Sequence, residues 1–514
     1  MLRLVPAALL LAALAVAQPA SAACTSKKCP DQLAIDDLRA RISARCDCAA
    51  AASRRAWVRC VKQVTNGAIK SGEVPRACAK AAHRCEAAAT CGRGDAVVCC
   101  EEKRGDVRGR IVKNAGRCRT GTVCTANPTT ADACRPDAAC GPPPLDDPGT
   151  AAWEPVPTAR VAAECGLDPV ILAEANGALD RPFAVIRHGK LCHEYYPPPR
   201  TVDEVNEAFS TTKTLGALVT GIAAWETRNL PRTGRKTGPI SDLDRVDHWL
   251  DEFTFNPDAH LAHVLAMIGH NANLAYGQRT YQYDIVGGVQ INRLSDVVTT
   301  ALQQDPERLG TNLEEFTQRY LYAPLGMHAS TWTNGDANKV YGFTWETTVR
   351  DMARVGLLML NGGLWNGERI LSSEWIYRMT HPSFEDTNYA YGYLTWLAID
   401  SEDGLSQCAP PAIYGTYPHG LSEAPDCGFV SGRPCTQRYD AGVWAALGLF
   451  GQFIIGHRGL DLVLVAKDMG TQEDTTRLWR AVRRALVPLD PRFQGDEAAF
   501  CTAYDAGEYA PDLR

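Results

Sequence analysis

The chain has 514 residues, too many for one ordinary domain, and its 45% hydrophobic and 22% charged content excludes a disordered protein. The net charge of −6 combines two unlike parts. Residues 24–140 hold 22 Lys and Arg against 12 Asp and Glu, a balance of +10, whereas residues 141–514 hold 30 against 47, a balance of −17. We therefore expect a basic module joined to an acidic one.

The first segment, MLRLVPAALLLAALAVAQPASAAC, is typical of a signal peptide. Arg3 precedes an apolar stretch, and Ala20-Ser21-Ala22 suits a signal peptidase. The apolar stretch is shorter than the roughly 18 to 20 residues that span a bilayer, and Ser21 stands where a lipobox has a larger aliphatic residue. We predict a signal peptide at 1–22, secretion or export to the periplasm, no lipid anchor at Cys24 and no transmembrane helix.

Twenty cysteines in an exported chain indicate disulfides rather than a metal site. Fourteen lie between Cys24 and Cys140 and six lie beyond, so each region can pair internally, although the connectivity stays open. No pair of CxxC units has the spacing of a zinc finger, so we expect no metal. We predict a disulfide-stapled module at 23–140. Its positive charge suits an anionic envelope polymer, and an ordinary solvated surface explains the charge equally well.

Prolines and small residues mark 141–160, GPPPLDDPGTAAWEPVPTAR, as an extended linker. A second domain is expected at 161–495, followed by a tail at 496–514. The domain opens with RPFAVIRHGKLCHEYYPP, which predicts a hairpin around His188-Gly189-Lys190. Near its end, apolar runs at 453–456 and 462–466 predict two more strands. Between them, helical patterns run over 214–226, 243–253, 261–268, 286–302, 313–321 and 347–361.

Strands at both ends of this domain and helices in its middle predict an α+β fold, in which one antiparallel sheet is flanked by helices. The most informative stretch within it is AFSTTKTLGALVTGIAAWE, residues 208–226. Ser210 and Lys213 stand about one turn apart where a buried helix begins, so they share a face. Burial would lower the pKa of the lysine, and a neutral amine can take a proton from the serine.

The S-x-x-K motif at the start of a buried helix resembles the active-site motif of the penicillin-recognising serine hydrolases. Over about 165–490, further segments resemble the class C β-lactamase-related branch of that family: FAVIRHGKLCHEYY, YLYAPLGMHASTW, TTVRDMARVGLLMLNGGLWNGERILSSEW and YGYLTW. The resemblance implies a β-lactamase/transpeptidase-like fold with a helical subdomain. It also implies that Ser210 is the nucleophile and Lys213 its base.

The family's second element is a tyrosine at the start of a helix. In YQYDIVGGVQINRL, Tyr283 holds that position and Tyr281 is the competing candidate. A lysine cation beside the phenol would stabilise the phenolate and let it relay protons. Both tyrosines can also be packed for structural reasons alone.

The third element, K-T-G or H-T-G on a strand at the sheet edge, is replaced here by Ala446-Leu447-Gly448. The cation and hydroxyl that would hold a β-lactam carboxylate are missing, so strong β-lactamase activity is not expected. The form from Gly448 to Gln452, G-x-x-G-Q, resembles the carboxylesterase and 6-aminohexanoate-oligomer hydrolase members. By this resemblance, the backbone N–H groups of Leu449 and Ser210 form the oxyanion hole.

The sequence thus predicts an exported esterase or amidase that forms an acyl-enzyme on Ser210, acts on a small or peptide-like substrate and needs no cofactor. The alternatives are a non-catalytic envelope-binding protein on the same scaffold, and a D-Ala-D-Ala carboxypeptidase or β-lactamase. An α/β-hydrolase is disfavoured because G-x-S-x-G is absent, and a metalloprotease because H-E-x-x-H is absent. We interpret His193, His263, His270 and His457 as structural, and no nucleic-acid partner is expected.

Overall fold

The structure is a computed structural model of the whole chain. It describes residues 29, 32–48, 50–71, 74–103, 106–118, 121–124, 131–134, 144–253, 255–274, 279, 281–283, 285–333, 339–381, 383–384, 391–400, 438–470 and 472–486. The predicted signal peptide at 1–22 and the predicted tail at 496–514 lie outside the described residues.

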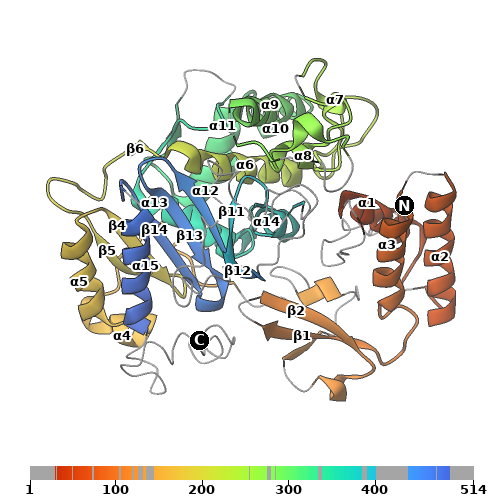
Figure 1. Cartoon of the computed structure of the whole chain (residues 1–514), viewed down its shortest axis with the longest axis horizontal. Coiled ribbons are helices and arrows are strands. Elements are labelled where there is room, and N and C mark those ends of the chain that lie inside the picture. The colour runs from red at the N-terminus through yellow and green to blue at the C-terminus, as the bar shows by residue number, and fades with distance from the viewer. Residues whose placement is uncertain are drawn as a thin grey trace, which may run out of the picture.

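The N-terminal part consists of three helices and a small sheet, drawn in red and orange in Figure 1. Its helices are α1 (Gln32–Arg45), α2 (Arg54–Ser71) and α3 (Arg76–Ala88), which pack around a small apolar cluster that includes Ile35, Ile42 and Val61. In the described residues, the strands β1 (Val97–Lys103), β2 (Asp106–Val112) and β3 (Thr122–Cys124) form an antiparallel sheet in the order β2-β1-β3. A second, separate cluster of cysteines and small residues lies beneath this sheet.

Disulfides staple this part, as the cysteine content predicted. All fourteen cysteines that the structure describes are disulfide-bonded. The bonds for which both partners are described are Cys29–Cys78, Cys46–Cys60, Cys48–Cys91, Cys99–Cys118, Cys100–Cys134 and Cys165–Cys192. Five join cysteines before residue 140, and the sixth joins two cysteines after it.

The larger part is built on an antiparallel sheet whose strands come from both ends of this region, as predicted. Six strands in the described chain follow the order β11-β12-β13-β14-β4-β5. Their bounds are β4 (Phe183–Arg187), β5 (Lys190–Tyr195), β11 (Trp396–Asp400), β12 (Arg438–Gly448), β13 (Gln452–His457) and β14 (Leu462–Ala466). β14 joins the strands from the two ends of this region by pairing with β4, in the register Val463↔Ile186. The α+β prediction is confirmed.

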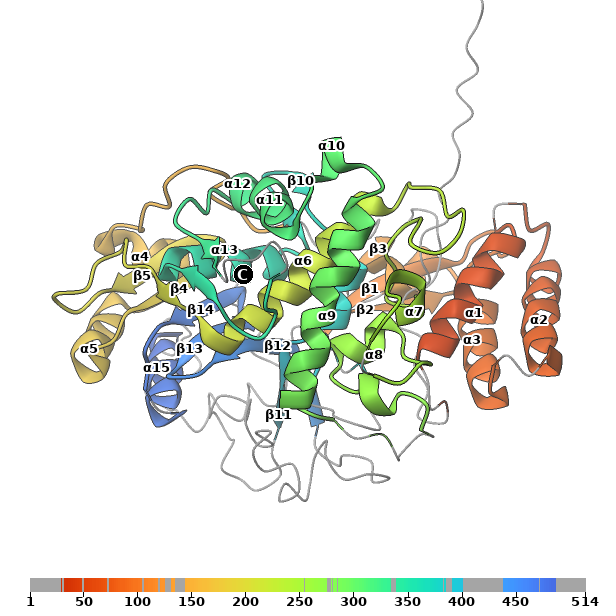
Figure 2. The same cartoon turned by 90° about the horizontal axis from the view of Figure 1, so that it is seen from above.

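Helices cover both faces of this sheet (Figure 2). On one face, α13 (Val349–Leu360) packs closely, because an added Cβ on Gly356 would stand 2.5 Å from Val463 Cγ1. On the opposite face lie α5 (Pro169–Leu179) and α15 (Gln472–Leu486), where the Trp479 ring stacks on His457 of β13. Burial of apolar side chains between these layers is the main stabilising contribution.

The described chain also contains the following helices and short strands. The helices are α4 (Thr158–Cys165), α6 (Thr212–Thr227), α7 (Val246–Trp249), α8 (Leu261–Leu265), α9 (Ile285–Leu302), α10 (Pro306–Leu309), α11 (Leu313–Thr317), α12 (Ala323–Leu325) and α14 (Ser373–Met379). The short strands are β6 (Asn206–Glu207), β7 (Thr331–Trp332), β8 (Trp345–Thr347), β9 (Leu364–Trp365) and β10 (Glu368–Arg369). None of the helices in the described ranges has the length and apolar content required to cross a bilayer.

One predicted helix is largely wrong. The pattern over 243–253 has apolar residues at helical spacing, yet only Val246–Trp249 is helical. The carbonyl oxygens of Asp247 and Leu250 accept hydrogen bonds from the Arg235 side chain instead of continuing a helix. A partner from another segment therefore satisfies the backbone groups that a longer helix would have used.

Residues 144–157 form no helix or strand, and they are bound tightly to α13. The buried Arg354 guanidinium donates to the carbonyls of Gly149 at 2.9 Å and Ala151 at 2.6 Å, and it also lies over the Trp153 ring. Asn361, just after α13, exchanges two hydrogen bonds with the backbone of Leu145.

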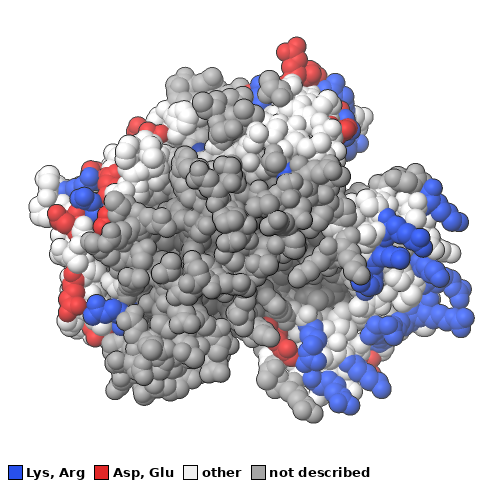
Figure 3. Space-filling view, viewed as in Figure 1, with Lys and Arg blue, Asp and Glu red and all other residues white. Residues whose placement is uncertain are grey.

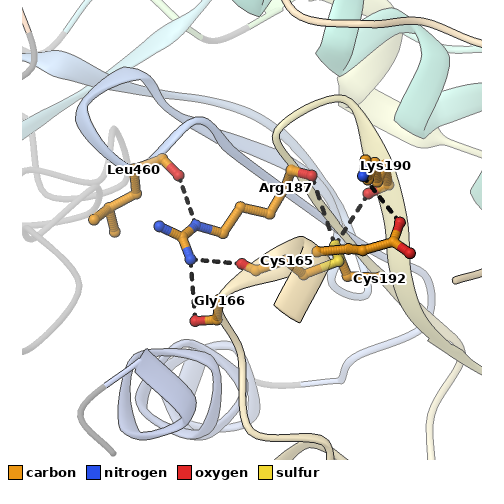
Figure 4. The surroundings of a disulfide bond; sticks show 7 residues. Cys165, Gly166, Arg187, Lys190, Cys192 and Leu460 are labelled. Atoms are coloured by element: carbon orange, nitrogen blue, oxygen red, sulfur yellow. Dashed lines mark hydrogen bonds and ion pairs between the residues drawn. A yellow bond between two sulfur atoms is a disulfide. The ribbon is translucent and has the colours of Figure 1, made fainter. Parts of the chain in front are cut away.

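A disulfide and an arginine hold α4 against the sheet (Figure 4). Cys165 at the end of α4 is bonded to Cys192 in β5. The fully buried Arg187 of β4 donates to the carbonyls of Cys165 and Gly166, which α4 leaves unpaired at its C-terminus, and to that of Leu460. A cation at a helix C-terminus is also favoured by the helix dipole.

Candidate active site

Ser210 lies in a single turn of 3₁₀ helix, Phe209–Thr211, that leads directly into α6. The turn is held from both sides, because Ala208 N–H donates to the Trp345 carbonyl at 2.7 Å and Thr211 Oγ1 donates to the Gln452 carbonyl at 3.3 Å. Phe209 has φ +47°, a left-handed conformation that costs free energy for a residue with a side chain. The hydroxyl of Ser210 is thus presented from a rigid, strained turn and is partly exposed.

Lys213, one turn into the same segment, donates to Ser210 Oγ at 2.8 Å and to the Gly342 carbonyl at 3.0 Å. Only 8% of its surface is exposed. Desolvation by burial lowers the pKa of the Lys213 amine to about 7, because the dry interior disfavours the ammonium form. The structure therefore brings together the two residues that the S-x-x-K spacing predicts.

Tyr283 lies just before α9 and its ring is near the same amine. The Lys213 Nζ is 4.8 Å from the centroid of the Tyr283 ring, which packs against Trp396 with centroids 5.4 Å apart. Tyr281 is instead buried against Tyr391, with ring centroids 5.0 Å apart. Of the two candidates, Tyr283 is the one with a contact to Lys213, and the helix that follows it begins at Ile285.

The end of β12 comes close to the serine turn. An added Cβ on Gly448 would stand 2.3 Å from the Ala208 carbonyl oxygen, a distance that only glycine allows. Leu449 follows directly, at the turn into β13, with its side chain 57% exposed. The stretch Ala446-Leu447-Gly448 thus borders the site, but β12 is not the edge strand that the resemblance implied, because β11 pairs beyond it.

Gln452 of the G-x-x-G-Q stretch stabilises the region where the end of β12 approaches the serine turn. Its amide donates to Asp468 Oδ1 at 2.7 Å, and Asp468 Oδ2 accepts from Arg200 at 2.6 Å and from Asn206 at 3.2 Å. Asn206 belongs to β6, four residues before Ser210. The network joins the β13 end of the sheet to the strand that enters the serine turn.

The sequence analysis missed Gly342 and the residues after it. The segment 342–345 is bound to the serine turn through Lys213, Ala208, Thr212 and Glu207: Thr344 N–H donates to Glu207 Oε1 at 2.9 Å and Trp345 N–H to Thr212 Oγ1 at 3.2 Å. The contact of Gly342 is made by its backbone carbonyl, which has no signature in the sequence.

Three of the four histidines named above, His193, His263 and His457, lie in packed surroundings. His193 Nε2 is 2.7 Å from Asn176 Oδ1, and burial lowers the pKa of His193, His263 and His457, the last to about 3. Throughout the described ranges, no three His, Cys, Asp or Glu side chains are grouped so that they could hold a metal ion.

No protein-family model and no curated protein matches this sequence. Similar solved structures include a 6-aminohexanoate-dimer hydrolase of Bacillus anthracis, 15% identical with a TM-score of 0.42, over 61% of this chain and 80% of that one. A β-lactamase of Bacteroides dorei is 13% identical with a TM-score of 0.42, over 62% and 97%. A family VIII carboxylesterase is 15% identical with a TM-score of 0.41, over 62% and 97%.

Proposed function

We propose that this chain is an exported serine hydrolase that cleaves ester or amide bonds through an acyl-enzyme on Ser210. The observation that carries the proposal is the 2.8 Å contact between Ser210 Oγ and the amine of a buried Lys213 whose pKa lies near 7. Near neutral pH, a large fraction of that amine is neutral and able to accept a proton. A purely structural lysine would not need to be placed on a serine hydroxyl in a dry interior.

The steps follow from this geometry. Ser210 Oγ attacks the substrate carbonyl carbon while its proton passes to Lys213 Nζ, and the tetrahedral intermediate collapses as the leaving group takes a proton. Tyr283, beside Lys213, relays that proton to the alcohol or amine that departs. Water then attacks the acyl-enzyme, with Lys213 and Tyr283 as base, to release the acid and free Ser210.

The developing oxyanion requires two backbone donors. Ser210 N–H and Leu449 N–H are the proposed pair, because the β12 end approaches the serine turn closely at Gly448. A backbone N–H acts in the same way whatever side chain the residue carries. The absence of the K-T-G lysine therefore leaves acyl transfer intact, and it removes a partner for a substrate carboxylate.

A fluorophosphonate probe tests the proposal. Wild-type protein should be labelled at Ser210, Ser210→Ala should not be labelled, and the matched control Ser241→Ala, in a loop outside the site, should be labelled like wild type. A folded wild-type chain that does not react would favour the non-catalytic, envelope-binding alternative.

The choice between an esterase and a β-lactamase or carboxypeptidase depends on Ala446. This residue is buried and carries no charge at the position where a cation would bind a carboxylate. We expect p-nitrophenyl esters to be cleaved at far higher kcat/KM than nitrocefin or a D-Ala-D-Ala peptide. Comparable rates on nitrocefin and esters would contradict this assignment.

We also propose that the N-terminal part binds an anionic envelope polymer through one face of α2 and α3. In Figure 3, Lys and Arg side chains gather over the N-terminal part, at the right of the view. Four of the five exposed cations of α2 recur at helical spacing on one face, and those of α3 do the same: Arg55, Arg59, Lys62 and Lys70, then Arg76, Lys80 and Arg84. In the described stretches 54–71 and 74–88, the one acidic residue is Glu86, which is buried and bonded to Arg39.

Charge reversal tests this surface. Binding to dextran sulfate, with neutral dextran as the reference, should weaken about fivefold or more at low salt in Arg59→Glu and should weaken for all chains as salt rises. Arg181→Glu makes the same change of charge at an exposed site in the larger part and should bind like wild type. Equal weakening by both variants would indicate a general charge effect and no specific surface.

A further inference from the structure

Exposed apolar side chains gather around the serine turn. Large hydrophobic residues with high exposure are few in the described chain: Val123, Val170, Val205, Leu274, Phe343, Leu449 and Phe450. Three of them, Phe343, Leu449 and Phe450, are 51%, 57% and 59% exposed and belong to the two segments that border Ser210. A single exposed hydrophobic residue is ordinary, but several beside one reactive group indicate a binding surface.

Backbone contacts hold each of these side chains close to the reacting atoms. Phe343 follows Gly342, whose carbonyl accepts from Lys213 Nζ at 3.0 Å, and precedes Thr344, which is bonded to Glu207. Leu449 and Phe450 follow Gly448, which touches Ala208. Consecutive Cα atoms are about 3.8 Å apart, so these residues lie within one or two residue lengths of the Ser210 and Lys213 contacts.

The serine turn itself contributes a ring to this surface. Phe209, directly before Ser210, packs edge-on against Phe450 with ring centroids 5.2 Å apart. Phe450 has φ +61°, and its carbonyl accepts from Gly470 N–H at 3.2 Å, so the exposed ring is held on a constrained turn. A strained turn that keeps an aromatic ring in solvent is consistent with a function for that ring.

The charges nearby disfavour an anionic ligand. Glu207 lies in β6 beside the turn, and Asp468 lies behind it. The Arg200 guanidinium is bonded to both Asp468 and Glu204. A substrate carboxylate beside this turn would lie near the Glu207 carboxylate, whereas a neutral apolar chain would bury the exposed rings.

We propose that Phe209, Phe343, Leu449 and Phe450 form an apolar acyl-binding surface, so that the preferred substrates are neutral esters or amides of medium-chain or aromatic acids. This inference rests on the proposed function, since the surface selects the group that is attached to Ser210. Each methylene that such a surface removes from water strengthens binding. For the six methylenes that separate acetate from octanoate, partial burial predicts a gain in kcat/KM of about tenfold to a hundredfold.

The test compares p-nitrophenyl acetate with p-nitrophenyl octanoate. In the wild type, kcat/KM should be at least about tenfold higher for octanoate, and that ratio should fall about tenfold in Phe450→Ser and in Phe343→Ser. Phe450→Leu keeps an apolar side chain and should restore most of the ratio. Val170→Ser changes an exposed hydrophobic residue in α5, on the far face of the sheet, and should leave the ratio unchanged.

The outcomes separate this inference from the proposed function. Hydrolysis that depends on Ser210 but shows no preference for octanoate would overturn the apolar surface and leave the serine hydrolase intact. If neither ester is cleaved, the proposed function fails, and calorimetry with the neutral ligand octanamide then decides. Binding that is lost in Phe450→Ser would keep the apolar surface, and no binding to the wild type would overturn it.

Discussion

The two parts of the chain are stabilised in different ways. Residues 29–134 surround small apolar clusters and have five of the described disulfides, whereas residues 144–486 share one extensive core and a single described disulfide. A small part cannot bury enough apolar surface by itself, so covalent links limit the entropy of its unfolded state. The larger core provides something that disulfides cannot, a dry interior in which a lysine has a pKa near 7.

Reduction of the disulfides should produce the largest difference in stability between the two parts. A native disulfide in a small domain typically contributes about 2 to 5 kcal/mol, so excess dithiothreitol should unfold the N-terminal part completely while the larger part stays folded. Limited proteolysis should then cleave within 29–134, dextran sulfate binding should be lost and ester hydrolysis should remain. Loss of hydrolysis at the same thiol concentration would show that the two parts are not stabilised independently.

The second-largest expected effect is the pH dependence of kcat/KM. The amine of Lys213 has to be neutral to act as a base, so kcat/KM should rise about tenfold per pH unit below its pKa of about 7 and level off above it. The total loss between pH 7 and pH 5 should be about fiftyfold, because about half of the amine is already protonated at pH 7. A rate profile measured between pH 5 and 9 checks this. A profile that is flat through pH 7 would remove Lys213 from the role of base.

The smallest expected effect is the contribution of Lys213 to the free energy of unfolding. The pKa of Lys213 is lowered from 10.5 in the unfolded chain to about 7 in the folded one, so the unfolded state binds more protons between these values. The free energy of unfolding should therefore rise with pH across this window, by about 1.4 kcal/mol per unit from this group. Lys213→Met lacks this slope and should be more stable than the wild type at pH 6, by roughly 1 to 3 kcal/mol, although inactive.

Urea unfolding of both chains at pH 6 and pH 9 measures the difference. The gap between them should shrink at pH 9, where the wild-type amine is neutral in the folded state. A Met variant that is less stable than the wild type at pH 6 would contradict the pKa shift.

The sequence could predict those elements whose partners are nearby in the chain. The hairpin around Gly189 and the predicted strands at 453–456 and 462–466 have runs of β-branched and aromatic residues, and the structure forms them as β4, β5, β13 and β14. The helix after Ser210 extends from 212 to 227, close to the predicted 214–226. The prediction of a helix over 243–253 was wrong because the Arg235 side chain donates to a backbone carbonyl in this segment. No local pattern in the sequence reveals that partner.

In the candidate active site, too, contacts between segments that are distant in the sequence could not be predicted. The pairing of Ser210 with Lys213 could be predicted because one helical turn sets their distance, and the choice of Tyr283 came from a motif. The carbonyl of Gly342 and the close approach of Gly448 depend on how distant segments pack, so the sequence offered no sign of them. α15 was also missed, although Leu478, Val482 and Ala485 recur at helical spacing and are buried.

The contacts of Arg354 determine where the larger part can be separated from the N-terminal part. A chain shortened to begin at residue 161 would lose Gly149, Ala151 and the Trp153 ring, and it would leave a buried guanidinium with one carbonyl partner, that of Leu325. An uncompensated buried charge is strongly destabilising. A fragment that keeps both the Arg354 contacts and the hydrogen bonds between Asn361 and Leu145 therefore starts no later than residue 145, so this segment belongs physically to the larger part.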